Sequence, residues 1–442
     1  MFKKKFYLLS IIWIISLLVV SLWTFENPDK IEFIKNIYKK NKSPIVKIEE
    51  KPENQIAANS FIVITQKIMS LSEKTAFISY EDNKNVFNPN FLNIYTQNGF
   101  LISNQKEEKI NLPNTFTMQR NGGVKTIIQN DEKKFALISN NKSKCFYASI
   151  VNLADSKEIF NSDCLPDSKK KTDFNGLGAS NIHLGDYIYL SIGTPTQNSK
   201  LIYNLAQNDN SIFGKIIKIK KKNFIESPFK FEIFSKGHRN PQGLTRINNK
   251  IFSVEHGPKG GDELNLINQT NNYGWPVVSY GTRYMYDDNG KSYNISHENK
   301  NFTEPLFALV PSVGISSINV CSSVLKKYYN KKCLMALSLY GNNLMPGKSI
   351  LIFLLNNDSN KIHSIEKIYL GGEMKLRHFV TNSKNELYED VDGNIYVSVD
   401  RKGIFKINFS NFRWVILRFF LLKLSIIFDL IEQPACVCYP YN

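Results

Sequence analysis

Residues 237–281 read GHRNPQGLTRINNKIFSVEHGPKGGDELNLINQTNNYGWPVVSYG and are dense in glycine, proline and side-chain amides. These residue types favour tight turns, because glycine reaches positive φ and asparagine hydrogen-bonds its own backbone. Short apolar runs such as KIFSV (250–254) lie between the turns. Short strands separated by tight turns are typical of antiparallel sheets, so this stretch predicts an all-β fold.

The same arrangement recurs along the chain, where a polar turn leads into a short apolar strand that carries a serine. These serines are Ser79, Ser139, Ser191, Ser253, Ser338 and Ser398. Repeats of this size indicate a β-propeller whose blades are small antiparallel sheets. The repeats therefore predict a six-bladed propeller over residues 59–410, and a β-sandwich with long insertions is the alternative.

The charge balance bears on possible partners. The chain has 442 residues and a formal net charge of +17, but only eight of its 56 basic residues are arginine. Proteins that read nucleic-acid sequence favour arginine for bidentate contacts. The scattered lysines are therefore interpreted as a solvated surface, and no nucleic-acid partner is expected.

The N-terminus carries a membrane signal. The basic start MFKKKF is followed by an uncharged apolar run from Tyr7 to Trp23, long enough to cross a bilayer as a helix. The lysines favour the cytoplasmic side, and no small-residue cleavage site follows. Residues 1–24 are expected to anchor the propeller in the inner membrane of a bacterial cell envelope, on the periplasmic side. A cleaved signal peptide, and hence secretion, is the alternative.

Two further segments lie outside the predicted propeller. Residues 25–58 are polar and charged, as in a tether. The tail, 411–442, contains an apolar run that holds charged residues from Arg413 to Asp429. Charges make a membrane crossing costly, so an apolar helix lying in the membrane interface is expected. A second crossing stays open.

Cysteine spacing permits two local disulfides. Cys145 and Cys164 are close in sequence, as are Cys321 and Cys333. Disulfides would form in an oxidising compartment, whereas buried free thiols would fit a reducing one. The spacing alone leaves both possibilities open.

Three pieces of the opening stretch together resemble a known family. GHRNPQGL (237–244), EHGPKGGDELNLI (255–267) and NNYGWPVVSYG (271–281) are similar to the signature of the soluble aldose dehydrogenases, the glucose/sorbosone dehydrogenase family. The similarity covers roughly residues 130–408. It implies a six-bladed propeller that uses pyrroloquinoline quinone (PQQ) and Ca²⁺ to oxidise an aldose sugar to a lactone.

The resemblance assigns metal ligands in this stretch. The backbone carbonyls of Gly257 and Pro258 would bind the calcium that also holds PQQ, and such hard oxygen ligands suit Ca²⁺. Asp262 and Glu263 would stabilise the loop or bind a second calcium together with Tyr273.

The resemblance also assigns cofactor contacts. Arg239 and Asn240 would donate hydrogen bonds to the quinone oxygens, where negative charge grows as a hydride arrives. Gln242 and His256 are expected beside them.

One catalytic group of the family is not matched. The family uses a histidine as the general base that takes the proton of the sugar hydroxyl, and its position falls on Asn175 in DFNGLGAS (173–180). An amide is not basic near neutral pH. His183 is close in sequence, and it would need a shifted loop to serve.

The cofactor clamp departs as well. Tyr340 stands where the family has a lysine that binds PQQ, and the family's paired arginines are represented by Lys375 and Arg377. Lys375 keeps the positive charge but loses the bidentate fork of a guanidinium.

Two functions of different classes remain. The chain is either a PQQ- and calcium-dependent dehydrogenase acting on a small sugar, or a non-catalytic propeller that serves as a ligand-binding or scaffold module in the cell envelope. Neither hypothesis fixes an oligomeric state.

Overall fold

The computed structural model describes residues 54–57, 61–81, 86–165, 173–195, 200–283, 293, 296–340, 348–370 and 374–411. The expected anchor, most of the expected tether and the tail after residue 411 lie outside these ranges. The chain divides into residues 1–49 and a second compact unit from residue 50 onward, and every described residue belongs to the second unit. No helix in the described ranges has the length and apolar character needed to cross a membrane.

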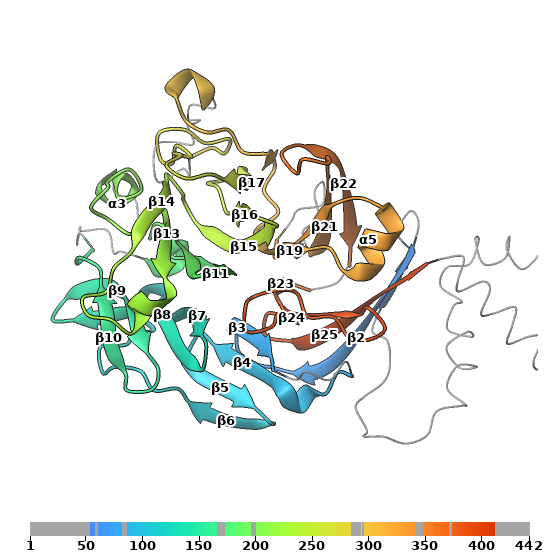
Figure 1. The fold of residues 1–442 in the computed structure, drawn as a ribbon, viewed down its shortest axis with the longest axis horizontal. Helices are drawn as coiled ribbons and strands as arrows, with labels where there is room; N and C mark the ends of the chain where they lie inside the picture. Colours follow the sequence, from blue (N-terminus) through green and yellow to red (C-terminus); the bar gives the residue numbers. More distant parts are fainter. Residues whose placement is uncertain are drawn as a thin grey trace, which may run out of the picture. The chain divides into compact units, whose positions relative to one another are not determined.

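The described residues form six antiparallel sheets arranged around a common axis (Figure 1). Five sheets are four-stranded meanders, and the sixth has five strands in the order β1-β2-β25-β24-β23. The predicted all-β, six-bladed propeller is therefore confirmed. The strands are β1 (Asn54–Ala57), β2 (Phe61–Ser70), β3 (Thr75–Tyr80), β4 (Leu92–Thr96), β5 (Phe100–Ser103), β6 (Lys106–Lys109), β7 (Val124–Asn130), β8 (Lys133–Lys142), β9 (Cys145–Asn152), β10 (Lys157–Asn161), β11 (Ala179–Leu184), β12 (Tyr187–Ile192), β13 (Lys215–Lys220), β14 (Glu232–Lys236), β15 (Pro241–Ile247), β16 (Lys250–Glu255), β17 (Asp262–Ile267), β18 (Phe307–Leu309), β19 (Ile315–Val320), β20 (Cys333–Ser338), β21 (Ser349–Leu355), β22 (Ile362–Tyr369), β23 (Leu376–Phe379), β24 (Ile395–Val399) and β25 (Gly403–Asn411). Within the described ranges helices are few and short, with α3 at Lys200–Asn204 and α5 at Ser323–Tyr329.

The first strand of each blade lies innermost. These inner strands contact one another around a closed ring in the order β3, β7, β11, β15, β19, β23 and back to β3. Strands near the axis are buried on both faces because each blade packs between two others. They therefore read as short continuous apolar runs, as β3 and β20 do, while the outer strand β6 is fully exposed.

The ring closes by pairing the two ends of the propeller. β2 runs antiparallel to β25, with Phe61 opposite Asn411 and Ser70 opposite Gly403. β1 then adds to the outer side of β2. The sixth blade thus begins inside the expected tether, because residues 54–57 form a paired strand.

Five of the repeated serines lie on the second strands of their blades, β8, β12, β16, β20 and β24. Ser79 is different, since it lies on the inner strand β3. In that blade Thr96 bonds the backbone of Phe100 on the third strand, as Ser338 bonds the backbone of Ser349. A threonine therefore takes the place of the serine in the first blade.

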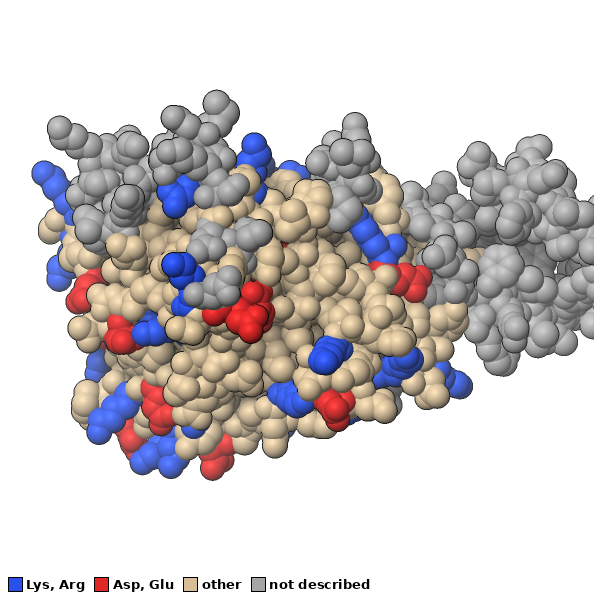
Figure 2. All heavy atoms as spheres, turned by 90° about the horizontal axis from the view of Figure 1, so that it is seen from above, with Lys and Arg blue, Asp and Glu red and all other residues tan. Residues whose placement is uncertain are grey.

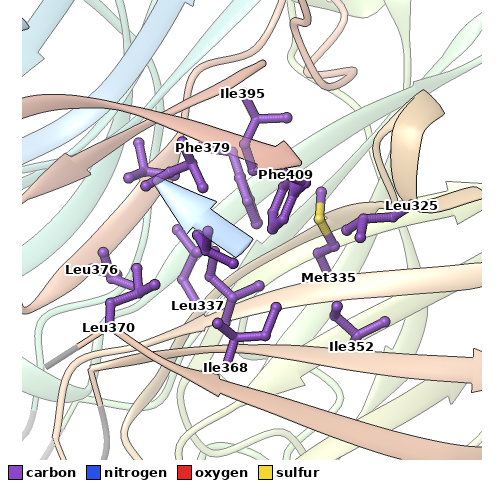
Figure 3. Close-up of a cluster of buried hydrophobic side chains, with 14 of the residues drawn as sticks. Leu325, Met335, Leu337, Ile352, Ile368, Leu370, Leu376, Phe379, Ile395 and Phe409 are labelled. Carbon is purple, nitrogen blue, oxygen red and sulfur yellow. The ribbon is translucent and has the colours of Figure 1, made fainter. Parts of the chain in front are cut away.

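Apolar side chains fill the space between neighbouring blades. Figure 3 shows one such cluster, in which Met335 and Ile352 of the fifth blade meet Phe379 and Phe409 of the sixth. Leu325 of α5 joins the same cluster. Packing of this kind makes the blades one structural unit.

Both expected cysteine pairs form disulfides. Cys145 joins Cys164 and Cys321 joins Cys333, with Cα–Cα distances of 5.2 and 5.5 Å.

Surface charge is mixed on the side that Figure 2 draws. Blue and red side chains are interspersed there, and no continuous basic patch covers that view.

Candidate functional site

The segment before β15 is held in place by one buried carboxylate. Glu255 at the end of β16 accepts hydrogen bonds from the Arg239 backbone N–H (2.8 Å) and from Asn265 Nδ2 (2.8 Å), and its Oε1 lies 3.2 Å from His238 Nδ1. The fully buried His238 ring stacks on Tyr273 at a centroid distance of 4.7 Å. GHRNPQG is therefore a rigid, internally bonded turn at the start of an inner strand.

Arg239 is bonded to the loop that was expected to bind calcium. Its Nη1 donates to the carbonyl oxygens of His256 (2.9 Å) and Gly257 (2.6 Å). Its guanidinium also lies 5.3 Å from the ring centroid of Trp275. The predicted quinone donor and one predicted calcium ligand thus contact each other directly.

Asn240 and Gln242 connect this turn to the third blade. Asn240 Oδ1 accepts hydrogen bonds from the Gly178 N–H (2.9 Å) and from Gln242 Nε2 (2.7 Å). A Cβ on Gly178 would lie 2.2 Å from that Nε2 atom, so only glycine allows this approach. The predicted cofactor contacts are thereby joined to the loop that contains Asn175.

A small pocket brings together most of the predicted calcium ligands. Gly257, Pro258, Glu263 and Tyr273 line it, together with Arg239. These residues come from the 256–261 turn, from β17 and from the NNYGW segment, which are far enough apart in sequence that only the fold makes them neighbours.

Asp262 points elsewhere. Its Oδ2 accepts hydrogen bonds from the backbone N–H groups of Val313 (3.0 Å), Gly314 (2.6 Å) and Ile315 (3.1 Å). This buried carboxylate fixes the connection into β19. It supports the loop between two blades and is not among the pocket-lining residues.

Glu263 is a buried carboxylate that faces another. It lies opposite Glu255 in the β16–β17 ladder, and Asn265 Nδ2 contacts both side chains. Burial, followed by repulsion from Glu255, raises the pKa of Glu263 well above its usual value. Such a pair attracts a cation, although no cluster of three or more His, Cys, Asp or Glu side chains suited to a metal occurs among the described residues.

Two donors in the same pocket lack partners. Neither His256 Nε2 nor Trp275 Nε1 makes a hydrogen bond of normal geometry to any described residue, although both atoms are buried. Burial, opposed by Asp262 and aided by Arg239, lowers the pKa of His256, so its imidazole is neutral near pH 7. Unpartnered buried polar atoms indicate a place where a polar ligand fits.

The rim contributed by the fifth and sixth blades is arranged differently. Lys375 Nζ lies 5.0 Å from the ring centroid of the exposed Tyr340. Arg377 forms a bidentate ion pair with Asp400, in which Nε lies 2.5 Å from Oδ1 and Nη2 contacts Oδ2. The three predicted clamp residues are therefore close to one another, with one cation over an aromatic ring and the other held by a carboxylate.

The two candidates for the base lie at different places. Asn175 is in the 3₁₀ turn η4 (Phe174–Gly176), at the site end of β11. His183 is at the opposite end of β11, beside the hairpin into β12, where burial, followed by Lys221 and Lys384, lowers its pKa to about 4. His183 is thus a buried histidine on the far side of the propeller and does not serve the site.

Sequence reasoning overlooked two lysines at the site end. Lys74 immediately precedes β3, and Lys125 lies within β7. Burial is the largest cause that lowers the pKa of each, and the positive charge of Arg377 lowers both further. The sequence feature that could have indicated Lys125 is a single charged residue within the mostly apolar strand VKTII (124–128).

Comparison with known proteins supplies the family. Residues 127–405, more than half of the chain, match the sequence profile described as Glucose / Sorbosone dehydrogenase. The chain belongs to the glucose/sorbosone dehydrogenase family. The match runs from within β7 to within β25 and leaves out the first blade, β1 and β2. It includes every residue of the site described above except Lys74 and Lys125.

Individual relatives match over shorter segments. An uncharacterized Synechocystis protein, slr1608, is 46% identical over 92 residues, covering 19% of this chain and 22% of that protein. Aldose sugar dehydrogenase YliI of Escherichia coli is 33% identical over 108 residues, covering 22% and 28%. Quinoprotein glucose dehydrogenase B of Acinetobacter calcoaceticus is 35% identical over 113 residues, covering 24% and 23%. The matched part is thus about a quarter of the length of each relative.

Solved structures share the fold over most of the chain. The apo-form of the soluble aldose sugar dehydrogenase of E. coli superposes with a TM-score of 0.58 at 17% identity, covering 78% of this chain and 99% of that one. The PQQ-bound aldose sugar dehydrogenase of Streptomyces coelicolor gives 0.52 at 14% identity, covering 79% and 98%. At these identities the likeness establishes the propeller alone.

Proposed function

We propose that this protein is a PQQ-dependent dehydrogenase that oxidises an aldose sugar to a lactone. The observation that carries the proposal is the pocket beside Arg239, where the buried atoms His256 Nε2 and Trp275 Nε1 make no hydrogen bond of normal geometry to a described residue. The family membership of residues 127–405 supports it.

The residues around the opening fit an anionic quinone. Arg239 and Lys375 supply positive charge from two sides, and Arg377 would do so on release from Asp400. The His256 and Trp275 donors can bind carbonyl or carboxylate oxygens. PQQ, when bound, would take a hydride from the sugar carbon. Arg239 and Asn240 would hold the quinone oxygens, and Gln242 would keep the Asn240 amide oriented through its 2.7 Å hydrogen bond.

Calcium belongs to the same proposal and requires one rearrangement. The Gly257 carbonyl is bonded by Arg239 at 2.6 Å, so a Ca²⁺ at that oxygen needs the guanidinium to move away. Pro258 and the Glu263 carboxylate line the same pocket and would complete an oxygen ligand set with Tyr273. Release of Arg239 from Gly257 would also free it to bind the quinone, so the two ligands would bind cooperatively.

The cellular location is part of the proposal too. Both disulfides favour an oxidising compartment. With residues 1–24 as an inner-membrane anchor, the propeller would lie in the periplasm and act on small sugars there.

The deciding experiment is a PQQ titration of the full chain, with and without calcium, followed by addition of a panel of aldoses. Bound PQQ is measured by absorbance and the lactone by chromatography. We expect calcium-dependent binding, then reduction of the quinone and an equal amount of lactone. Binding without lactone would support the second candidate, a ligand-binding propeller, which the Asn175 and Tyr340 positions favour.

A matched pair of variants locates the binding site. Arg239→Met removes a charge-assisted donor and should weaken PQQ binding about tenfold or more. Arg246→Met is the control, because Arg246 lies near the other end of β15 and pairs with Glu386 at 2.8 Å. Equal affinity of the two variants would contradict a PQQ site beside Arg239.

A further inference from the structure

Lys125 is an unusual residue for the inner strand of a blade. The neighbours of Lys125 in β7 are Val124, Thr126 and Ile127, all buried, while Lys125 itself is partly exposed. Its Nζ donates hydrogen bonds to the carbonyl oxygens of Asn121 (2.8 Å) and Phe174 (3.3 Å). The ammonium position is therefore fixed at the site end of the second blade.

This position is next to the place where the base is missing. Phe174 and Asn175 are consecutive residues of the turn η4. The other end of this loop, Gly178, donates to Asn240 Oδ1 at 2.9 Å. Lys125 and the predicted quinone-binding Asn240 thus hold the same short loop from its two ends.

A second lysine, the fully buried Lys215, shows what a purely structural role looks like. Lys215 Nζ donates to three carbonyls, those of Leu205 (2.9 Å), Ala206 (2.9 Å) and Phe213 (3.0 Å), which use all three N–H groups of an ammonium. Lys125 has two carbonyl acceptors. One position on Lys125 Nζ, a third N–H of the ammonium or the lone pair of the neutral amine, is therefore left for a further partner.

Burial, more than the nearby charges, lowers the pKa of Lys125. Burial lowers its pKa to about 7, the positive charges of Arg377 and Lys74 act in the same direction, and the Asp173 carboxylate opposes them. Asp173 is engaged elsewhere, because Asn175 N–H and Asn121 Nδ2 each donate to it at 2.6 Å. An amine near this value can take up and release protons at neutral pH.

We propose that Lys125 is the general base of this propeller and takes the role of the histidine that the sequence lacks at position 175. The inference rests on the proposed function. In the reaction the sugar C1 gives its hydride to the quinone, and the C1 hydroxyl gives its proton to Lys125 Nζ. The C1–O bond becomes the carbonyl of the lactone, and Lys125 returns the proton to solvent.

The first test is substitution of Lys125. Lys125→Met should lower kcat/KM by about 100- to 10,000-fold, the range for loss of a general base, with PQQ affinity unchanged. In the parent, kcat/KM should rise with pH to a plateau above an apparent pKa near 7, because the neutral amine is the active form. Lys74→Met removes a positive charge that lowers the pKa of Lys125, so its kcat/KM should reach the same plateau at a higher pH.

The second test returns the histidine. The double variant Lys125→Met with Asn175→His places an imidazole on the same loop and should recover most of the lost activity. Recovery also shows that Lys125→Met is folded. If Lys125 only neutralises an anionic cofactor, Lys125→Met weakens PQQ binding instead, and Asn175→His restores nothing.

A third measurement does not depend on turnover. The pH dependence of Lys125 acetylation, followed by mass spectrometry in the full chain, reports its pKa directly. We expect half-maximal reactivity of Lys125 near pH 7, with acetylation of the exposed Lys133 followed in the same samples as the reference. An ordinary pKa for Lys125 overturns the inference.

The outcomes separate the inference from the proposed function. A parent that reduces PQQ with a sugar and a Lys125→Met variant of equal activity overturn the inference alone. A parent that binds PQQ and produces no lactone from any aldose overturns both.

Discussion

The two sides of the site opening differ in what their polar groups contact. On the side formed by residues 237–281, Glu255, Arg239 and Asp262 all bond to nearby protein groups. On the other side Lys375 lies over the exposed Tyr340, and Lys125 has only two carbonyl acceptors. The side formed by residues 237–281 is bonded to itself except at His256 Nε2 and Trp275 Nε1. On the other side Arg377 pairs with Asp400, while Lys375 and Lys125 have fewer protein partners.

It follows that the residues of a long family motif can serve mainly to hold the fold together and not to bind the ligand. In the EHGPKGGDELNLI stretch, Glu255 and Asp262 hold turns and blade contacts together. The identity of the ligand depends on residues from separate blades, each of which stands alone in the sequence. Three substitutions test this division, and the first has the largest expected effect.

Asp262→Ala should destabilise the side of the opening formed by residues 237–281. The carboxylate accepts three backbone N–H groups between 3.1 and 2.6 Å, and its loss leaves them buried without partners. The free energy of unfolding should fall by about 3–5 kcal/mol, measured by chemical denaturation without calcium. Asp209→Ala is the control, because Asp209 is 71% exposed and its pair with Lys236 contributes under about 1 kcal/mol.

Equal losses in the two variants would mean that Asp262 has no structural role. A loss in Asp262→Ala that appears only when calcium is present would instead support its assignment as a metal ligand.

His183→Gln, at the end of the propeller far from the site, should change the pH dependence of stability and leave activity unchanged. The folded pKa of His183 is about 4 and its ordinary value is 6.5, so between these pH values the unfolded chain binds a proton that the folded chain does not. Stability contributed by the neutral ring is present above pH 6.5 and is lost as the pH falls toward 4. Between pH 6.5 and pH 4 the free energy of unfolding of His183→Gln should therefore fall by up to about 3 kcal/mol less than that of the parent.

The measurement is the denaturation free energy at pH 7 and at pH 4, with the exposed His363→Gln as the control. Sugar oxidation at pH 7 should be the same in His183→Gln and the parent. A large loss of activity would show that His183 reaches the site after all.

Tyr340→Lys should strengthen PQQ binding on the side of the opening that departs from the family. The side chain is 54% exposed, so the substitution is tolerated, and an ammonium there returns the cation that the family has at this position. PQQ affinity should rise about tenfold, or about 1.4 kcal/mol, in the absorbance titration. Tyr369→Lys adds the same charge on the outer strand β22 and should leave the affinity unchanged. Weaker binding by Tyr340→Lys would argue for a ligand other than a polyanionic quinone.

The blades could be predicted from the sequence because five of the six are continuous segments of the chain. Ser139, Ser191, Ser253, Ser338 and Ser398 mark second strands, and the turns between them carry their own signals. A search for serine alone misses Thr96, although the threonine hydroxyl makes the same backbone hydrogen bonds as a serine hydroxyl. The strand at residues 54–57 also escaped notice, because its polar sequence NQIA becomes a strand only through pairing with β2.

The site was predictable only in part. Gly257, Pro258, Glu263 and Tyr273 do line one pocket, as the resemblance implied. The partners of Asp262 could not be predicted, because Val313 to Ile315 belong to another blade. The environment of Lys125 could not be predicted either, because it depends on Phe174 and Arg377, which are distant in sequence and which the fold brings near Lys125.

The pairing of β2 with β25 has a consequence for how the protein is made. β2 is among the first strands to leave the ribosome, and its partner is the last strand of the propeller. During almost the whole of synthesis β2 has an open edge able to pair with another chain. A messenger cut short before Gly403 would therefore yield an aggregation-prone open ring and not a smaller propeller.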